Sequence, residues 1–431
     1  MKKVYYIVFA VVLMFGACSK DIEIEEDRLV FEPYDAKVDG LCYKLSADTK
    51  TAVVTAGDVF YRDEVVIPET IGYGGATYRV VAIAKEAFSG CQNLRSVRIP
   101  DSVTDIGESA FLECFNLETI SFPKSLSAVP TRMCRGCYAL KSVVLPSDVR
   151  AIGYEAFSNC TSMTSVTMPD GVEEISSNAF FCCSSLTSII LPKSVRNIGW
   201  QAFTGCTALT KVSLPEGLTR LPAECFAHCS RLSEVNIPEG VVYLSEHCFT
   251  NCVSLTHISL PQSLRSMDRG VFEYCTGLTS MTIPSGVEQI GALLFSECSH
   301  LERVEWQPQN IPEGIFKNCT SLKAFVVPEG VTGIQANAFD GCSHLSVLLL
   351  PSTLLTIAPG AFKDCMSLKE VSCYALTPPQ LPFMTGSMAD ASLIFESVDL
   401  TQATLNVPVS VLSAYQSLSP WSLFGQIKSM P

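Results

Sequence analysis

A short signature recurs along most of the chain and constrains its fold more than any other feature. Thirteen cysteines stand in register, each 23 residues after the last except for one step of 21. A Phe precedes each by three residues, except that Cys134 precedes Cys137, and a Leu follows each by three, except for Met163. A period of about 20–50 residues indicates a solenoid or an array rather than independent domains. The column is Cys91, Cys114, Cys137, Cys160, Cys183, Cys206, Cys229, Cys252, Cys275, Cys298, Cys319, Cys342 and Cys365.

The unit that starts at Cys206 shows how one repeat is built. Its apolar positions are Leu209, Val212, Leu214, Leu218 and Leu221. The first three follow an L-x-x-L-x-L pattern, and their alternation with polar residues indicates a strand that is buried on one face. Pro215 ends this strand, because proline lacks the N–H group that a ladder needs. An Ala-Phe segment leads to the next Cys, and we expect it to form a short helical turn.

One coil alone cannot bury enough apolar surface to offset the entropy lost on ordering it. Stacking solves this problem, because each coil then covers both faces of its neighbours and pairs with their backbones. We therefore predict a repeat solenoid of the α/β type that is dominated by β-structure. It is a right-handed stack of thirteen leucine-rich coils over residues 87–374.

Both ends of the stack need caps. Residues 30–86 predict a β-rich N-terminal cap, since Gly40–Leu45 and Thr51–Val54 alternate like strands and Gly72-Tyr73-Gly74-Gly75 is typical of a hairpin. Residues 375–431 predict a small C-terminal cap with a last strand at Leu405–Pro408 and a short helix. Aromatic residues in this segment suit a lid over the final coil.

The first residues are typical of a targeting signal. Lys2 and Lys3 precede an apolar run over residues 4–15, which is too short for a membrane span. Residues 1–17 are thus predicted to be a signal peptide, and the small residues before Cys18 resemble a bacterial lipobox, which implies lipidation of Cys18. A plain secretory signal cut near Ala17 is the alternative. Residues 18–29 are rich in acids and predict a solvated tether.

The repeated unit F-x-x-C-x-x-L-x-x-V-x-L-P-x-x-V-x-x-I-G resembles the BspA-type class of leucine-rich repeats, and the resemblance covers Phe88 to Cys373. It implies a surface-exposed protein that adheres to host matrix proteins, bacterial surface proteins or other surface ligands. It brings no common catalytic motif. The acidic stretch after Cys18 resembles the export signal of Bacteroides-type lipoproteins and implies a surface-exposed outer membrane lipoprotein.

Twenty cysteines in an exported chain would normally indicate a disulfide framework. In this register, however, stacked side chains point in parallel directions, and their Cβ atoms lie too far apart for good bridge geometry. We interpret the column as small buried thiols. Cys134 and Cys137 form a C-x-x-C pair, but they occupy the Phe and Cys columns and are interpreted as core positions. One optional bridge between Cys225 and Cys248 stays open.

Charge and motif content argue against several classes of function. The net charge of -13 opposes nucleic acid binding, which needs clustered Lys and Arg. The five histidines fall in four different repeat columns, and no Ser-His-Asp set, glycosidase carboxylate pair, P-loop or metal motif is present in the sequence. We therefore predict no catalytic residue, no metal site and no cofactor.

The candidate binding surface consists of strand residues that point away from the core, together with large residues at variable positions. The strand candidates are Arg95, Arg98, Thr119, Ser165, Thr167, Thr282 and Arg303. The large variable residues are Phe115, Tyr138, Tyr154, Phe181, Trp200, Tyr243 and Tyr274, of which we expect half to pack along the edges. Tyr154 and Trp200 share a column two coils apart and are the preferred aromatic candidates. The shortened coil at Trp306 is expected to bend the stack or to expose that residue.

These observations predict a lipid-anchored, non-catalytic scaffold that binds a macromolecule, either a protein or a glycan. The membrane is contacted through the lipid anchor only. Two alternatives stay open, which are a carbohydrate-binding accessory lipoprotein of a nutrient-uptake system and a structural protein of the cell envelope.

Overall fold

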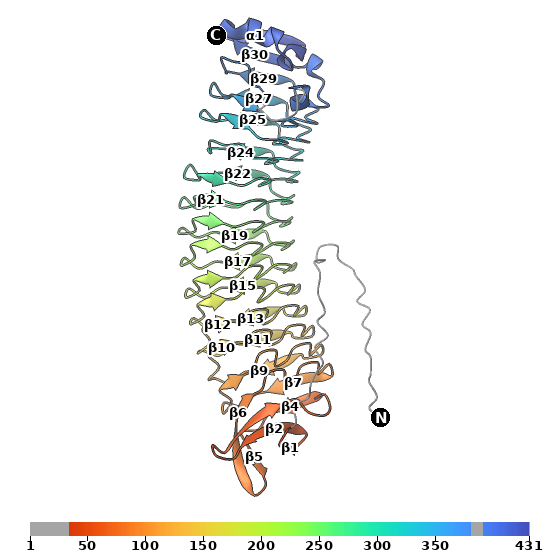
Figure 1. Cartoon of the computed structure of the whole chain (residues 1–431), viewed down its shortest axis with the longest axis vertical. Helices are drawn as coiled ribbons and strands as arrows, with labels where there is room; N and C mark the ends of the chain where they lie inside the picture. Colours follow the sequence, from red (N-terminus) through yellow and green to blue (C-terminus); the bar gives the residue numbers. More distant parts are fainter. Residues whose placement is uncertain (1–33, 381–390, 431) are drawn as a thin grey trace, which may run out of the picture. The chain divides into compact units, whose positions relative to one another are not determined.

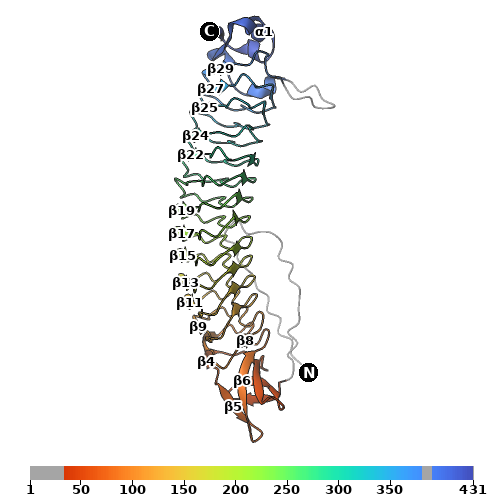
Figure 2. The ribbon, with the colours of Figure 1, turned by 90° about the vertical axis from the view of Figure 1, so that its left-hand side faces the viewer.

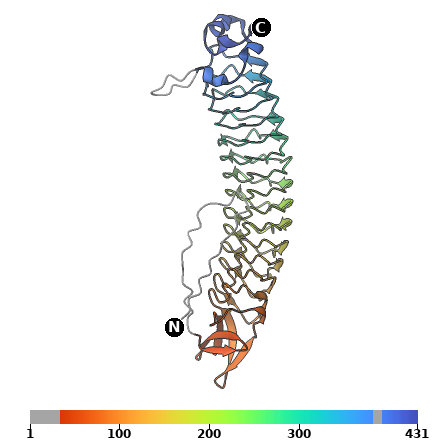
Figure 3. The same cartoon turned by 90° about the vertical axis from the view of Figure 1, so that its right-hand side faces the viewer.

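The computed structural model describes residues 34–380 and 391–430, which belong to one compact unit. The predicted signal peptide, Cys18 and the tether lie outside the described residues. The chain forms a β-dominated solenoid of about 15 turns, as predicted (Figure 1). Figures 2 and 3 show the successive coils from two opposite sides.

The L-x-x-V-x-L segments form a first ladder of parallel strands along the stack. Figure 2 places β9 to β19 along one edge. The register is one coil per step, for example Lys211↔Glu234 and Val212↔Val235. Val212 and Leu214 are buried, so the predicted alternation is confirmed. The ladder consists of β4 (Asp63–Val66), β7 (Leu94–Arg98), β9 (Thr119–Ser121), β11 (Ser142–Val144), β13 (Ser165–Thr167), β15 (Ser188–Ile190), β17 (Lys211–Ser213), β19 (Glu234–Asn236), β22 (Ser280–Thr282), β24 (Arg303–Glu305), β25 (Ala324–Val326), β27 (Val347–Leu350) and β29 (Glu370–Cys373).

The second apolar pair of each repeat forms another parallel ladder of two-residue strands. Ile152 pairs with Ile175, which pairs in turn with Ile198. Proline or a turn separates the two ladders in each coil, so a coil has two straight segments joined by turns. The second ladder consists of β8 (Asp105–Ile106), β10 (Ala128–Val129), β12 (Ala151–Ile152), β14 (Glu174–Ile175), β16 (Asn197–Ile198), β18 (Arg220–Leu221), β20 (Tyr243–Leu244), β21 (Ser266–Met267), β23 (Gln289–Ile290), β26 (Gly333–Ile334) and β28 (Thr356–Ile357).

The Phe column forms stacks of rings in the core, with one interruption where Cys134 takes the Phe position between Phe111 and Phe157. From Phe157 to Phe316, neighbouring ring centroids lie 5.5–5.8 Å apart and their planes agree within 18°. Each such contact contributes roughly 0.5–1.5 kcal/mol beyond area burial. The stack continues past the regular repeats, through Tyr61 onto Phe88 at 4.8 Å and through Phe395 onto Phe362 at 5.4 Å. The cap residues therefore extend the same core.

The cysteine column ties each coil to the one before it. From Cys114 to Cys365, each thiol of the column donates to the carbonyl oxygen at the Phe position of the preceding coil, which for Cys160 is Cys134 O. Cys114 Sγ lies 3.0 Å from Phe88 O, and Cys365 Sγ lies 3.3 Å from Phe339 O. These S–H donors are weak, and they add a contact from the next coil to carbonyl groups that already accept from a backbone N–H in their own coil, such as Cys91 N to Phe88 O at 3.1 Å. A small thiol therefore suits this position.

The predicted helical turn between the ladders is wrong, because these segments consist of turns with left-handed residues. In the unit before Cys206, Gln201 has φ 56° and Gly205 has φ 74°, five residues and one residue before the cysteine. The same two positions are left-handed in nearly every coil. Within the described residues the one α-helix is α1 (Leu412–Ser417).

The N-terminal cap is a mixed sheet of strands β1 (Ala36–Val38), β2 (Leu41–Ser46), β3 (Thr51–Thr55), β5 (Thr70–Tyr73) and β6 (Ala76–Ile83). The hairpin predicted at Gly72–Gly75 is present, since β5 and β6 pair antiparallel around Gly74 and Gly75. β6 also pairs with β8, and β4 pairs with β7. Both ladders therefore continue directly from the cap.

The C-terminal cap adds two parallel strands to the first ladder, β30 (Thr404–Pro408) and β31 (Gln426–Met430), where one was predicted. Between and before them lie η1 (Ala391–Phe395), η2 (Leu400–Gln402), η3 (Val409–Val411), α1 and η4 (Trp421–Leu423). Trp421 Nε1 donates to Pro379 O at 3.1 Å, and Tyr415 OH donates to Ala375 O at 2.9 Å. These buried aromatics close the last coil.

The expectation that the shortened coil exposes Trp306 is wrong. Trp306 is 5% exposed and packs edge-on against Phe316, with ring centroids 5.5 Å apart. Its indole takes up the space near Phe325 as well. The two missing residues are thus compensated by a large side chain that turns into the core.

The surroundings of Gly199 show how closely adjacent coils approach each other. A Cβ atom at this position would lie 2.2 Å from Ser177 N in the preceding coil, which is backbone and cannot swing aside. We predict that Gly199→Ala lowers the free energy of unfolding by about 1–3 kcal/mol, the usual cost of overpacking. Chemical denaturation followed by circular dichroism measures this change. Gly72→Ala is the control, because a Cβ there meets nothing within 4 Å; equal stability of both variants would contradict the close approach.

Candidate functional site

The seven strand candidates all lie on the first ladder with exposed side chains. Arg95, Arg98 and Thr119 lie together on β7 and β9. Ser165 and Thr167 lie on β13, and Thr282 and Arg303 lie on the paired strands β22 and β24. The structure therefore brings the candidates into three groups along one face, rather than into one cluster.

Charged side chains on this face pair with each other across neighbouring coils. Lys211 Nζ lies 2.7 Å from Glu234 Oε1, and Lys323 Nζ lies 3.1 Å from Glu302 Oε2. Glu305 accepts from Arg303 at 2.6 Å and from Thr282 at 3.1 Å. Exposed pairs of this kind contribute little stability, about 0–1 kcal/mol. Because opposite charges lie next to each other, the face has no strong electrostatic potential of one sign.

Sequence reasoning missed exposed apolar residues on the same strands. Ile190 is 76% exposed, and Val144 and Val326 at the equivalent position of other coils are exposed as well. All three stand seven residues after the column cysteine, where alternation places a side chain away from the core. The alternation pattern alone could have found them. The strand face therefore presents exposed apolar side chains as well as Ser and Thr hydroxyl groups.

A groove lies beside Ile190, where the strands end. Its volume is about 1430 Å³, and it crosses four successive coils. Ile190, Ser213, Asn236 and Ser259 form one wall, and Lys193, Glu216 and Glu239 lie on the other side. The floor consists of Leu191, Pro192, Leu214, Pro215, Ile237, Pro238, Leu260 and Pro261. The groove thus offers apolar contact with polar rims, and it follows the direction of the stack.

The aromatic candidates lie on the turns rather than on the strands. Tyr154 is 37% exposed and Trp200 is 47% exposed. The Arg132 guanidinium lies over the Tyr154 ring, 5.5 Å from its centroid. Of the other large variable residues, Tyr138 and Tyr274 are exposed, whereas Phe115, Phe181 and Tyr243 are partly buried. Tyr138 stacks on Phe115 with ring centroids 5.0 Å apart.

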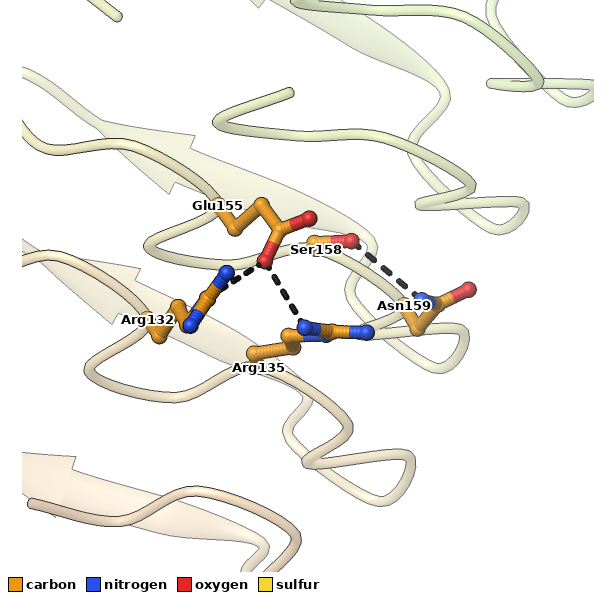
Figure 4. Close-up of polar contacts among 5 residues, drawn as sticks. All are labelled: Arg132, Arg135, Glu155, Ser158 and Asn159. Atoms are coloured by element: carbon orange, nitrogen blue, oxygen red, sulfur yellow. Dashed lines mark hydrogen bonds and ion pairs between the residues drawn. The ribbon is translucent and has the colours of Figure 1, made fainter. Parts of the chain in front are cut away.

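A polar cluster lies at Glu155, the residue that follows Tyr154, and Figure 4 shows Arg132 and Arg135 directed toward it. One carboxylate oxygen of Glu155 accepts hydrogen bonds from Arg132 Nε and from Arg135 Nη1, both at 2.9 Å. The Glu155 side chain is 13% exposed, so these ion pairs are better shielded than those on the strands. The cluster therefore holds the turn that carries Tyr154 in place.

The cysteines behave as core residues, as predicted. Eighteen of the described cysteines are buried free thiols, and Cys182 is half-buried. Cys137 Sγ donates to Phe111 O at 3.2 Å, so this cysteine of the C-x-x-C pair joins two neighbouring coils in the core. Cys225 and Cys248 are both buried and carry no bridge. Within residues 34–380 and 391–430, no set of His, Cys, Asp or Glu side chains is arranged to hold a metal ion.

The histidines make separate local contacts. His247 Nδ1 lies 3.3 Å from Glu273 Oε2, and this contact raises the pKa of His247. Burial lowers the pKa of His228, whose Nδ1 lies 3.1 Å from the Asn251 amide. His300 and His344 each contact a backbone carbonyl oxygen at 2.7 Å. These contacts join neighbouring coils and do not converge on one site.

The profile of the BspA type leucine rich repeat region matches this chain in six copies, over residues 76–186, 127–256, 173–302 and 303–377. A leucine-rich repeat protein from Bacteroides ovatus is 27% identical with a TM-score of 0.62, and the match covers 87% of this chain and 100% of that one. A leucine rich cell surface protein from Faecalibacterium prausnitzii is 26% identical with a TM-score of 0.50, covering 84% and 98%.

The pneumococcal vaccine antigen PcpA is 20% identical with a TM-score of 0.51, over 92% of this chain and 98% of that one, which is a likeness of fold. No curated protein sequence matches significantly. None of the helices in the described part of the chain is long and apolar enough to cross a membrane.

Because these thiols are buried, we predict that the free energy of unfolding decreases at alkaline pH. Burial raises the pKa of Cys91, Cys229 and Cys275 to about 12, whereas thiols of an unfolded chain titrate near about 8.5. Above that pH the unfolded chain loses protons that the folded chain keeps, so stability is complete below pH ~8.5 and falls as pH rises toward ~12. Denaturation midpoints between pH 7 and 11 measure this effect.

A thiol reagent provides the control for this prediction. In the folded protein at pH 8 we expect the buried thiols of the cysteine column to stay unlabelled, and to react only after denaturation. Rapid labelling of the column in the folded state would contradict the burial of these thiols.

Proposed function

The chain belongs to the BspA-type leucine-rich-repeat family, and we propose that it is a non-catalytic cell-surface scaffold that binds a macromolecule. The observation that carries this proposal is the groove beside the first ladder, with Ile190 on its wall. An exposed apolar residue in a groove with polar rims has the composition of a protein-binding surface. About 15 turns at ~4.8 Å each also give a length of roughly 70 Å, which suits a large ligand.

The groove favours an extended protein segment as the ligand. Its floor of leucine and proline side chains offers no metal ligand or nucleophile, and its volume of about 1430 Å³ is spread over four coils. Lys193 and Glu216 lie on the same rim in successive coils, so a partner with charges of both signs can pair with them. The candidates Ser165 and Thr167 lie on β13, one coil before Ile190 on β15, and extend the same face.

We propose further that the scaffold is a surface-exposed outer membrane lipoprotein, anchored through Cys18. The support is the sequence pattern around Cys18 and the cell-surface protein among the similar structures. Two or more acyl chains give stable attachment, because each buried methylene contributes ~0.8 kcal/mol.

The anchor is tested by Cys18→Ala. The variant cannot be lipidated at this position, so we expect it to leave the membrane fraction and appear in the soluble fraction. Immunoblots of fractionated cells measure the distribution, with intact cells treated with protease to test surface exposure. Unchanged partition of Cys18→Ala into the membrane would refute lipid anchoring.

The binding function is tested with the purified protein on an array of host matrix proteins and bacterial surface proteins. We predict at least one saturable protein ligand and at least a tenfold loss of affinity in Ile190→Glu, because a buried contact would receive an unpaired charge. Val326→Glu is the matched control, since Val326 occupies the same column outside the groove. If the folded protein binds nothing, or if both variants bind like the wild type, the proposal fails.

A further inference from the structure

Three successive coils place Tyr154, Ser177 and Trp200 in one column, six residues before the cysteine. The two aromatic side chains are exposed, and the small Ser177 lies between them. Arg132 comes from the coil before Tyr154, so it covers the ring from the N-terminal side of the stack. The next two members of this column along the stack are Ser177 and Trp200. The space over Ser177 between the two exposed aromatic positions is called the slot below.

A row of planar polar side chains runs directly beside this slot, five residues before the cysteine. Its members in successive coils are Arg132, Glu155, Asn178, Gln201 and Glu224. All five have left-handed φ angles between 52° and 57°, as the same position has in the other coils, so this conformation belongs to the turn of the repeat. Later coils place Gly270, Gly314 and Gly360 at the same position. The polar side chains of this row are thus not required by the backbone.

The two neighbours of Asn178 in this row bond to residues on their far sides and not to Asn178. On one side Glu155 bonds to Arg132 and Arg135, and on the other side Gln201 Nε2 donates to Glu224 Oε2 at 2.7 Å. Asn178 is 8% exposed, and its Oδ1 atom is buried without a hydrogen-bond partner within the described residues. An unsatisfied buried acceptor costs about 1–3 kcal/mol. The amide turns easily about χ2, so a ligand hydroxyl at Ser177 can satisfy it.

We propose that the slot between Tyr154 and Trp200 binds one ring of a neutral carbohydrate. The C–H groups on a sugar ring carry partial positive charge and pack on the negative face of an aromatic ring. Neighbouring sugar hydroxyls match the paired donors and acceptors of Asn178, Gln201 and Glu155. The proposal rests on the proposed binding function, because the slot is a second site on the same scaffold.

The width of the slot favours a puckered ring over a flat one. In the same three coils the buried rings of Phe157, Phe180 and Phe203 are spaced 5.6 and 5.5 Å apart, so we expect positions two coils apart in one column to be separated by about 11 Å. Two van der Waals contacts of ~3.8 Å take up roughly 7.5 Å of this width. The remainder suits a substituted sugar ring, whereas a flat aromatic side chain would leave a gap.

The charges at the slot favour a neutral sugar. Arg132 and Arg135 are balanced by Glu155 on one side, and Glu224 adds a second carboxylate on the other. Two positive and two negative side chains leave no net charge to attract an acidic glycan or an acidic peptide. Recognition therefore depends on stacking and on hydroxyl contacts.

Trp200 provides a natural reporter for the test. Of the three tryptophans, Trp306 and Trp421 are buried and Trp200 is exposed. The full chain is screened on a printed array of neutral and acidic glycans, and the neutral oligosaccharides that bind are titrated while tryptophan fluorescence and acrylamide quenching are recorded. We expect binding to shift the emission and to protect Trp200 from the quencher.

Three variants test the site. Trp200→Ala and Tyr154→Ala should each lower affinity at least tenfold, and alanine occurs naturally in this column at Ala223 and Ala292. Ser177→Leu should block the slot with both aromatics in place, while large residues such as Lys85 and Arg269 in the same column show that the fold accepts them. Tyr274→Ala, at an exposed aromatic of another column, is the control and should bind like the wild type.

Three results would overturn the carbohydrate slot. One is wild-type affinity for the same oligosaccharide in Ser177→Leu and Trp200→Ala. Another is a lack of glycan binding by a protein that still binds its protein ligand in an Ile190-dependent way, which leaves the proposed function intact. Binding of acidic glycans or acidic peptides alone at Trp200 would also refute the neutral sugar.

Discussion

The stack of buried phenylalanine rings is the interaction on which the rest of the structure depends. Ring centroids 5.5–5.8 Å apart hold successive coils in one register. The thiol of Cys206, bonded to Phe180 O at 3.3 Å, joins the same two coils at the base of the ring. Because each coil buries its faces against its neighbours, no coil is stable alone. One missing ring is tolerated, because Cys134 takes the Phe position in one coil and both ladders keep their register there.

Much of this fold could be predicted from the sequence, because three columns repeat at one period and strand alternation identifies the buried face. The ends could not, since Tyr61 and Phe395 continue the ring stack without the cysteine or the spacing. The helical turn was wrong because left-handed residues such as Gln201 turn the chain without a helix. Trp306 was misjudged because sequence shows a shortened coil but not the space that the missing residues leave.

The candidate surface was predictable only in part. Alternation places Arg95 and Thr282 on the solvent side, but it says nothing of which neighbours approach them. The groove arises from Leu-Pro turns of four coils, and each turn taken alone has the pattern of a strand ending. The Asn178 oxygen has no partner because Glu155 and Gln201 bond to other residues, and the sequence does not reveal these contacts. The strand face and the turn face thus carry the two proposed binding sites on one core.

Amide hydrogen exchange of Phe203→Ala, compared with the wild type, tests the central claim most directly. The substitution removes one ring from the middle of the stack. If the coils stabilise each other through this column, protection falls most in the coils of Phe180, Phe203 and Phe226 and falls less with distance on both sides. Unchanged protection in the coils of Phe180 and Phe226 would contradict the account, because the stack would then not couple its neighbours.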